Sequence, residues 1–202
     1  MPSTKEKILE QSLLLFNQNG LKQTTLQTIA DAIPISVGNL AYHYKNKNEI
    51  VAAHTVKLNA RLQEALSHYR NFPGMIDFQL QLNHILETTA EYRYLFVNLG
   101  EVQRLFPETF TVIQTFAQKL VTQIESRLEY QQEKQALYPI PLTSIQHLAK
   151  TLSSQIVLAQ SSILLFPDTQ EFFVAFWELV YPHFTPQGEQ EWRQHILPAL
   201  VN

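Results

Sequence analysis

Side chains that suit contact with nucleic acid crowd one short stretch near the N-terminus. Residues 36–47 hold hydroxyl, amide, aromatic and cationic groups in close succession. An amide such as that of Asn39 can hydrogen-bond a base edge, whereas lysines and hydroxyls bind phosphate oxygens. We therefore predict base contacts from Val37, Gly38, Asn39 and Tyr42. We predict contacts to the DNA backbone from Thr25, Ser36, His43, Lys45 and Lys47.

Two short predicted helices and a turn present these groups. Thr24 or Thr25 can cap a helix that Pro34 stops after about two turns. Ser36 can cap the next helix, over 37–44, which is short enough to lie in a DNA major groove with its first residues against the bases. The elements together predict a DNA-binding helix-turn-helix. A small surface hairpin shares single signals of this kind, so the interpretation depends on their coincidence.

Longer predicted helices flank this motif on both sides. Ser3 and Glu6 have the spacing of a capping box, which predicts an N-terminal helix that ends near Gly20. Asn46 and Glu49 have the same spacing and predict the start of another helix. No proline or glycine interrupts the following stretch, so we expect that helix to connect the motif to the rest of the chain.

The N-terminal quarter resembles regulators of the tetracycline-repressor (TetR) type. Their pattern combines apolar residues on the first helix with Gly, Thr-Thr, Ile-Ala, a Ser-x-Gly-x-Leu recognition helix and a Lys-x-Lys pair. The matching residues here are Ile8, Leu9, Phe16, Gly20, Thr24, Thr25, Ile29, Ala30, Ser36, Gly38, Leu40, Tyr42, His43, Tyr44, Lys45, Lys47 and Glu49. The resemblance implies a small effector, bound in a C-terminal helical bundle, that alters the distance between two DNA-reading heads.

Two positions depart from that family pattern. The family usually has glycine where this chain has Pro34, and tyrosine where it has Ala41. Proline cannot take the positive φ that is open to glycine, so we expect a different turn geometry. In the family the missing tyrosine commonly touches phosphate. Its absence predicts weaker sequence-independent affinity unless Tyr42 or Tyr44 replaces it.

Charge is distributed unevenly along the 202 residues, whose formal net charge is −3. Residues 1–70 hold eight lysines and arginines against five acids, while residues 71–202 hold seven against thirteen. The basic excess therefore belongs to the predicted motif. The chain has no cysteine, and we find neither a signal peptide nor a run long enough to span a membrane. We expect a cytoplasmic protein that makes no membrane contact.

The fold class expected from the sequence is all-α. The chain has only five glycines, and its apolar residues recur at intervals of three and four. We predict a helix-turn-helix domain over 1–46, a connecting helix over 47–72 and a helical ligand-binding and dimerisation domain over 73–202. In that last domain, prolines separate predicted helices over 75–90, 91–105, 108–136, 143–165, 169–184 and 187–200.

Aromatic residues are frequent in the C-terminal part, which favours a largely apolar small-molecule effector. Any single one of them is more often a core residue than a ligand contact. The predicted ligand-binding residues are His84, Phe96, Asn98, Phe110 and Phe176. Further polar candidates for orienting a ligand are Arg93, Glu101 and Arg104.

The last long pair of predicted helices combines slim serines with large aromatic side chains. Two copies of such a pair can form a four-helix dimer interface. The predicted interface residues are Leu152, Ile156, Ala159, Ile163, Phe173, Phe176, Trp177 and Val180. The alternative is a hairpin buried within one subunit. A two-fold protein is favoured because a helix-turn-helix reads paired half-sites.

Sequence signatures of common enzymes and metal sites are missing. No glutamate has a histidine three residues later, as a di-iron bundle requires, and neither a phosphate-binding P-loop nor a nucleophile elbow occurs. We therefore expect no catalysis, no metal and no cofactor. The predicted function is a homodimeric, ligand-responsive repressor that binds a palindromic operator in double-stranded DNA. The alternative is a helical small-molecule-binding or protein-interaction module that has lost specific DNA binding.

Overall fold

Helices make up most of the computed structural model, which describes residues 2–71 and 73–201 and the side chains of all of these but Val201. The described part contains no strand, only one isolated bridge between Leu137 and Phe184. This confirms the all-α fold class. Phe72, at the predicted end of the connecting segment, lies outside the described residues.

The chain divides into two compact units. Unit 1 comprises Met1–Arg61 and Thr88–Ile113, and unit 2 comprises Leu62–Glu87 and Gln114–Asn202. This division differs from the predicted boundaries, because a segment far along the sequence packs with the N-terminal helices. Local composition carries no signal for that long-range packing.

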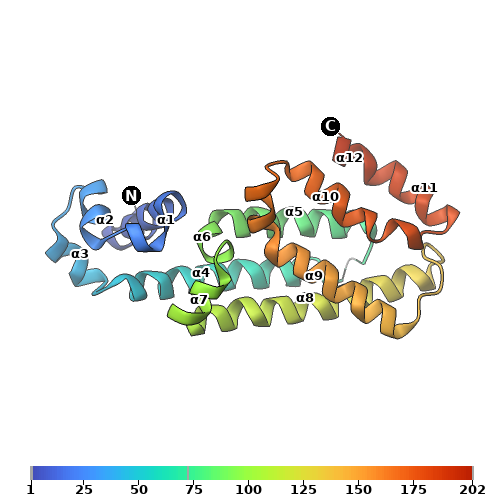
Figure 1. The fold of residues 1–202 in the computed structure, drawn as a ribbon, viewed down its shortest axis with the longest axis horizontal. Helices are drawn as coiled ribbons and strands as arrows, with labels where there is room; N and C mark the ends of the chain where they lie inside the picture. The colour runs from blue at the N-terminus through green and yellow to red at the C-terminus, as the bar shows by residue number, and fades with distance from the viewer. Residues whose placement is uncertain (1, 72, 202) are drawn as a thin grey trace. The chain divides into compact units, whose positions relative to one another are not determined.

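Unit 1 contains the three helices of the predicted motif together with two short helices from the middle of the chain (Figure 1). They are α1 (Thr4–Gln23), α2 (Leu26–Ala32), α3 (Val37–His43), most of α4 (Lys47–His68), α6 (Arg93–Phe96) and α7 (Leu99–Leu105). The last residues of α5 (88–91) and the first residues of α8 (107–113) complete unit 1.

Side-chain caps fix the starts of these helices. The Ser3 hydroxyl accepts from the backbone N–H of Glu6 (3.3 Å), and the Glu6 carboxylate accepts from Ser3 N–H (2.7 Å), which is the predicted capping box of α1. α1 runs past its predicted end, because Gly20 takes a φ of 77° and the helix resumes beyond it. Where one helix over 91–105 was predicted, Asn98 separates α6 from α7. Its φ of −141° is not helical, and its side chain accepts from Glu101 N–H.

A buried histidine joins three helices of unit 1. His54 on α4 is 1% exposed, and its Nδ1 lies 2.9 Å from the Tyr94 hydroxyl on α6. Its Nε2 lies 3.0 Å from the Leu9 carbonyl oxygen and 3.3 Å from the Ser12 hydroxyl on α1. Burial lowers the pKa of His54 to about 4, although the Leu9 hydrogen bond raises it. The imidazole is therefore neutral at pH 7.

Unit 2 is a helical bundle of the C-terminal half. Its helices are the end of α4, most of α5 (Met75–Glu91) and α8 (Pro107–Glu133), and then α9 (Leu142–Leu165), α10 (Thr169–Glu178), the 3₁₀ helix η1 (Tyr181–His183), α11 (Pro186–His195) and α12 (Leu197–Val201). The predicted helices over 169–184 and 187–200 are each divided in two. The prolines at 182 and 198 contribute to this, since each removes a backbone donor.

Aromatic packing holds α10 against α5 in this bundle. The Phe78 ring meets the rings of Phe176 and Trp177 edge-on, at centroid distances of 5.5 and 5.9 Å. The Trp177 indole N–H donates to Gln79 Oε1 over 2.6 Å, so its one polar group is satisfied in the core. The second tryptophan of the chain, Trp192 on α11, also belongs to unit 2.

Candidate nucleic-acid interface

α3 is anchored on one side and exposed on the other. The Leu40 side chain is fully buried and fixes the helix to unit 1. Ser36 caps it as predicted, because its hydroxyl accepts from Asn39 N–H over 3.1 Å. Gly38 and Asn39 are exposed, and Tyr42 is 85% exposed, whereas Val37 is half-buried. The predicted base-reading residues thus share the first turns of one short helix.

The groups predicted to contact phosphate lie around α2 and α3. Thr25 caps α2, accepting from Thr28 N–H over 3.1 Å, and is exposed. Lys45 is exposed, while the half-buried His43 ring meets the Tyr42 ring edge-on. Sequence reasoning missed Thr28, whose hydroxyl lies 2.8 Å from that of Thr25. The Thr-x-x-Thr spacing was the available signal for that pair.

Lys47 is held in place rather than extended into solvent. It is half-buried, and its Nζ donates to the Leu21 carbonyl oxygen over 2.6 Å, which ties the start of α4 to α1. An ammonium group has three N–H donors, so two others can reach an anion. Asn46 caps α4 as predicted, accepting from Glu49 N–H over 3.1 Å. The Glu49 carboxylate accepts from Lys45 N–H instead of completing a capping box.

Of the two tyrosines that can replace the one missing at position 41, only Tyr42 is accessible. Tyr44 is buried, and burial raises the pKa of its hydroxyl. Lys5 Nζ lies 5.6 Å from the centre of its ring. Tyr44 therefore belongs to the packing of unit 1.

The turn between α2 and α3 keeps a positive φ in spite of its proline. Pro34 has a φ of 20°, far from the value of about −65° that its ring prefers. The backbone N–H of Ile35 still donates to the Ala30 carbonyl over 3.1 Å. The turn is thus closed by a hydrogen bond while its proline is strained.

The predicted ligand-binding residues are divided between the two units. Phe96, Asn98 and Phe110 belong to unit 1, whereas His84 and Phe176 belong to unit 2. Phe96 and Phe176 are fully buried core residues, and the Asn98 side chain caps α7. The prediction of a shared pocket from these residues stays without structural support, because aromatic content alone cannot separate core from cavity.

Most of the predicted interface residues lie on the inner face of α9 and α10. Those buried within unit 2 are Leu152, Ile156, Ala159, Phe176, Trp177 and Val180. Ile163 and Phe173 are half-buried. These six side chains are covered within their own unit, so the prediction that they contact a second copy gains no support here and stays a prediction. The alternative, intramolecular packing, accounts for them.

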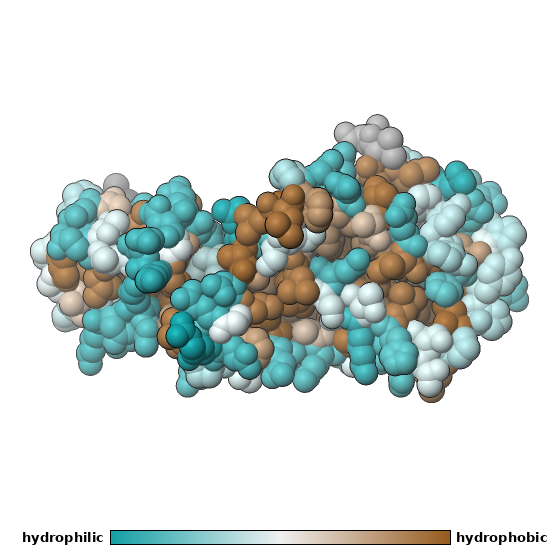
Figure 2. Space-filling view, viewed as in Figure 1, coloured by the Kyte–Doolittle hydropathy of each residue, from teal (hydrophilic) through white to brown (hydrophobic). Residues whose placement is uncertain are grey.

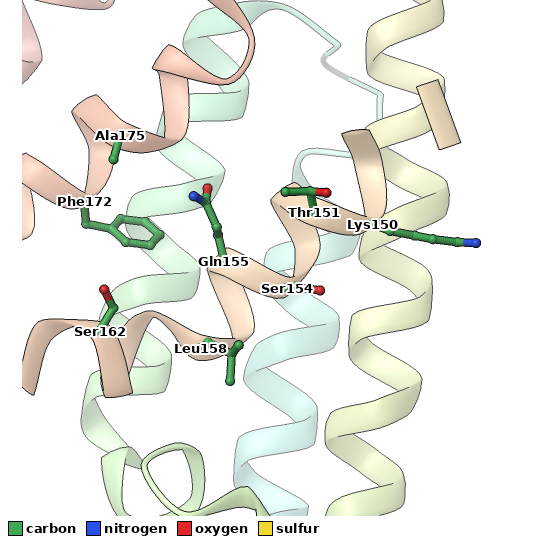
Figure 3. Close-up of a pocket in the computed structure, with 8 residues that line it drawn as sticks. All are labelled: Lys150, Thr151, Ser154, Gln155, Leu158, Ser162, Phe172 and Ala175. Atoms are coloured by element: carbon green, nitrogen blue, oxygen red, sulfur yellow. The ribbon is translucent and has the colours of Figure 1, made fainter. Parts of the chain in front are cut away.

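The outer face of the same two helices carries exposed apolar surface (Figure 2). Its large exposed side chains are Leu158, Leu164, Leu165, Phe166 and Val174, a group that we call the outer patch. A pocket of about 450 Å³ lies beside it, and Figure 3 shows the Phe172 ring of α10 directed toward Gln155 of α9 there. The Gln155 Oε1 is a buried acceptor with no hydrogen-bond donor among the described residues.

Neither a metal-binding cluster nor a membrane-spanning helix is found among the described residues. No three histidine, aspartate or glutamate side chains there are grouped so as to hold a metal ion. None of the helices in the described ranges is both long enough and apolar enough to cross a bilayer.

Comparison with known proteins identifies the α1–α4 segment. Residues 8–54 match the family model described as "Bacterial regulatory proteins, tetR family". This match spans the capped α3, the α2–α3 turn and the start of α4. The N-terminal part of the chain is therefore similar to TetR-family regulators. The resemblance predicted from the sequence is thereby confirmed.

Three known proteins illustrate the similarity. The biofilm operon icaADBC negative transcriptional regulator IcaR of Staphylococcus epidermidis is 26% identical over 127 residues, a match that spans 62% of this chain and 61% of that protein. A crystal structure of a TetR-family transcriptional regulator from Marinobacter aquaeolei VT8 has a TM-score of 0.84 at 21% identity, over 96% of this chain and 98% of that one. The SmeT–triclosan complex has a TM-score of 0.59 at 16% identity, over 92% and 93%.

Proposed function

We propose that this protein is a homodimeric transcription repressor that binds a palindromic operator and responds to a small effector. The observation that carries the proposal is α3 itself, which is capped by Ser36, anchored by Leu40 and exposed through Asn39 and Tyr42. A short, rigid, exposed helix of this kind suits a DNA major groove. IcaR, a relative of this chain, is named as a negative regulator of transcription.

Around α3, the exposed groups supply the contacts that position a protein on DNA. Thr25 and Lys45 are exposed, and Lys47 keeps donors for a phosphate oxygen beside its bond to Leu21. The modest basic excess of residues 1–70 predicts moderate affinity for a single head. Tight operator binding therefore depends on pairing two heads.

We propose that the outer patch pairs two copies of the chain. An exposed group of leucines and a phenylalanine is unfavourable in water and is typical of an interaction surface. The neighbouring Gln155 Oε1 lacks a donor, and a second copy can supply one. A dimer through this face keeps the two-fold symmetry that a palindromic operator requires.

In this proposal the effector acts by shifting a population of dimers. The dimers exist in two states, and in one of them the spacing of the heads does not match the operator half-sites. A ligand that binds this mismatched state more tightly reduces DNA binding. The reduction is limited by the difference between the ligand's affinities for the two states. The SmeT–triclosan complex is an example of a similar fold with a bound ligand, triclosan. The regulator acts in the cytoplasm, where both DNA and effector are available.

A gel-shift experiment tests the proposal. The purified protein is titrated onto the promoter region next to its own gene and onto an unrelated fragment of equal length, at several salt concentrations. We expect a shift of the promoter fragment that weakens steeply with salt and survives competition by the unrelated fragment. Equal affinity of the folded protein for both fragments, or no shift at all, would contradict it.

A second candidate function is a helical ligand-binding module that no longer reads DNA specifically. The strained Pro34 and the absence of a tyrosine at position 41 favour it, since both lie within the DNA-contact region. Ligand binding by a protein that fails the gel-shift test would support this alternative.

A further inference from the structure

A groove in unit 2 between α4 and α8 has a cationic lining. Its volume is about 520 Å³. The polar and charged side chains that line it include Gln63, Ser67, Arg70, Lys119, Gln123 and Arg127, and no aspartate or glutamate is among the described residues of its wall. Pockets for small molecules typically have volumes of about 300–1,000 Å³. The groove therefore has the size of a ligand site and a single sign of charge.

The sequence places these side chains on two facing helix stripes. On α8, Lys119, Gln123 and Arg127 recur every four residues, so they project from one face. On α4, Gln63 and Ser67 have the same spacing. Lys119 Nζ donates to Gln63 Oε1 across the groove over 2.8 Å, and Gln123 Nε2 donates to the Leu66 carbonyl over 3.0 Å. The two walls are thus fixed to each other.

The floor of the groove holds a buried positive charge. Arg127 is only 4% exposed, and one of its Nη atoms donates to the Tyr69 carbonyl (2.9 Å) and to Gln81 Oε1 (3.1 Å). Its guanidinium carbon lies 5.0 Å from the centre of the Phe78 ring. Burial lowers the pKa of Arg127 to about 10, and this effect outweighs the attraction of Asp77, which raises it. An additional negative charge nearby would be favourable.

The rim of the groove carries two exposed cations, Arg70 and Lys119. The partner of Lys119 is a neutral amide oxygen, so its charge is not cancelled by that bond. A purely structural role explains the inner donors, because Gln123 and Arg127 satisfy carbonyls at the C-terminal end of α4. This structural role does not explain why Arg70 and Lys119 lie at the rim.

We propose that this groove binds a small organic anion, with a carboxylate, sulfonate or phosphate head between Arg70 and Lys119 and an apolar body against Leu66 and Pro73. Guanidinium and ammonium groups make charge-assisted hydrogen bonds to such heads, and Arg127 adds a weakly screened positive potential from below. Naming this anion as the effector rests on the proposed function. Binding itself does not depend on DNA.

A matched pair of fluorescent probes tests the proposal. The probe 8-anilinonaphthalene-1-sulfonate carries a sulfonate, whereas N-phenyl-1-naphthylamine is the same aromatic body without it. Each is titrated into the wild-type chain, Arg70→Gln, Lys119→Gln and the control Lys150→Gln, whose lysine lines the α9–α10 pocket instead. We expect sulfonate affinity to fall about fivefold in each groove variant, as the loss of one charge-assisted contact predicts. The neutral probe and the control variant change less than about twofold.

The outcomes separate this inference from the DNA-binding proposal. Unchanged sulfonate affinity in both groove variants, or an equal loss for the two probes, would overturn the anion site. Circular dichroism confirms that each variant is folded before titration. Because no DNA is present, a negative result leaves the gel-shift outcome standing, and a failed gel shift leaves the probe titrations interpretable.

Discussion

The α3 surface and the outer patch are both exposed, but they differ in chemistry and in what supports them. α3 presents a glycine, an amide and a phenol to solvent, whereas the outer patch presents leucines and a phenylalanine, with Leu165 75% exposed. In unit 1, which carries α3, the hydrogen bonds of His54 join α4 to α1 and α6. Beneath α10, the support is the aromatic packing of Phe78.

This difference teaches what each surface needs. Water can satisfy the polar groups of α3 when the protein is alone, so that surface is stable without a partner. Water cannot compensate the apolar area of the outer patch, so burying it in a dimer is favourable by about 25 cal/mol per Å². The first surface is suited to an occasional charged partner and the second to a lasting one.

The largest expected effect is on dimerisation. Leu165→Glu places a carboxylate in the proposed interface, and burying it unpaired should weaken the dimer by roughly 3 kcal/mol or more, about a hundredfold. Sedimentation velocity across a concentration series measures this. Leu105→Glu, an equally drastic change at an exposed leucine of α7, is the control and should leave the dimer intact. If both variants dimerise as tightly as the wild type, the outer patch is not the dimer interface and its contrast with the α3 surface disappears.

Acid should affect the support of α3 more than that of α10. The folded pKa of His54 is about 4, below its usual 6.5, so the unfolded chain binds an extra proton between these values. Stability is complete above pH 6.5 and falls as the pH decreases toward 4, by about 3 kcal/mol in total. Hydrogen exchange of α1 and α4 amides across this range measures it. His54→Gln should flatten the profile, whereas the exposed-residue control His195→Gln should not. If the stability of His54→Gln falls with decreasing pH as steeply as that of the wild type, His54 is not the source of the acid sensitivity.

Two substitutions at the α3 surface separate positioning from base reading. Lys47→Ala should weaken binding to all sequences by about 1 kcal/mol and make the salt dependence shallower by about one unit. Asn39→Ala should cost about 1–3 kcal/mol at particular base pairs only. Fluorescence anisotropy with a panel of operator variants measures both. Lys47→Arg, which keeps the charge, is the matched control. Identical effects of the two alanine changes on every operator would contradict the assigned roles.

The smallest effect concerns the turn before α3. Pro34→Gly replaces a proline at a φ of 20° with the residue that tolerates positive φ, and should stabilise the protein by about 0.5–1 kcal/mol. Thermal unfolding measures the change. Pro139→Gly, at an exposed proline outside the helices, should instead destabilise by a similar amount through unfolded-state entropy. A lower melting temperature for Pro34→Gly would mean that the turn tolerates its proline.

Local signals explain which parts of the fold were predictable. The caps at Ser3, Thr25, Ser36 and Asn46 each depend on residues three positions apart, so the starts of α1 to α4 were predicted closely. The segment 91–105 was predicted as one helix because the helix break at Asn98 is not marked by a proline or a glycine in the sequence.

The less predictable features depend on contacts between distant residues. α9 is apolar on two faces, one with Ile156 and one with Leu158, and its periodicity cannot tell which face is covered by the same chain. The same holds for Arg127, whose burial follows from the loop after α4 and from α5 packing around it. The residues of α3 that we predict to read bases lie on one helix as expected, because that helix is short and bounded by local signals.

Both indole chromophores, Trp177 and Trp192, belong to unit 2. Tryptophan emission, excited selectively near its red edge, therefore reports on unit 2, whereas far-ultraviolet ellipticity senses every helix, including those of the α1–α3 head. Heating or urea curves recorded by the two optical methods should coincide if the chain melts as one cooperative body and diverge if the head melts first. The wild-type protein thus carries its own spectroscopic label for one half of the molecule.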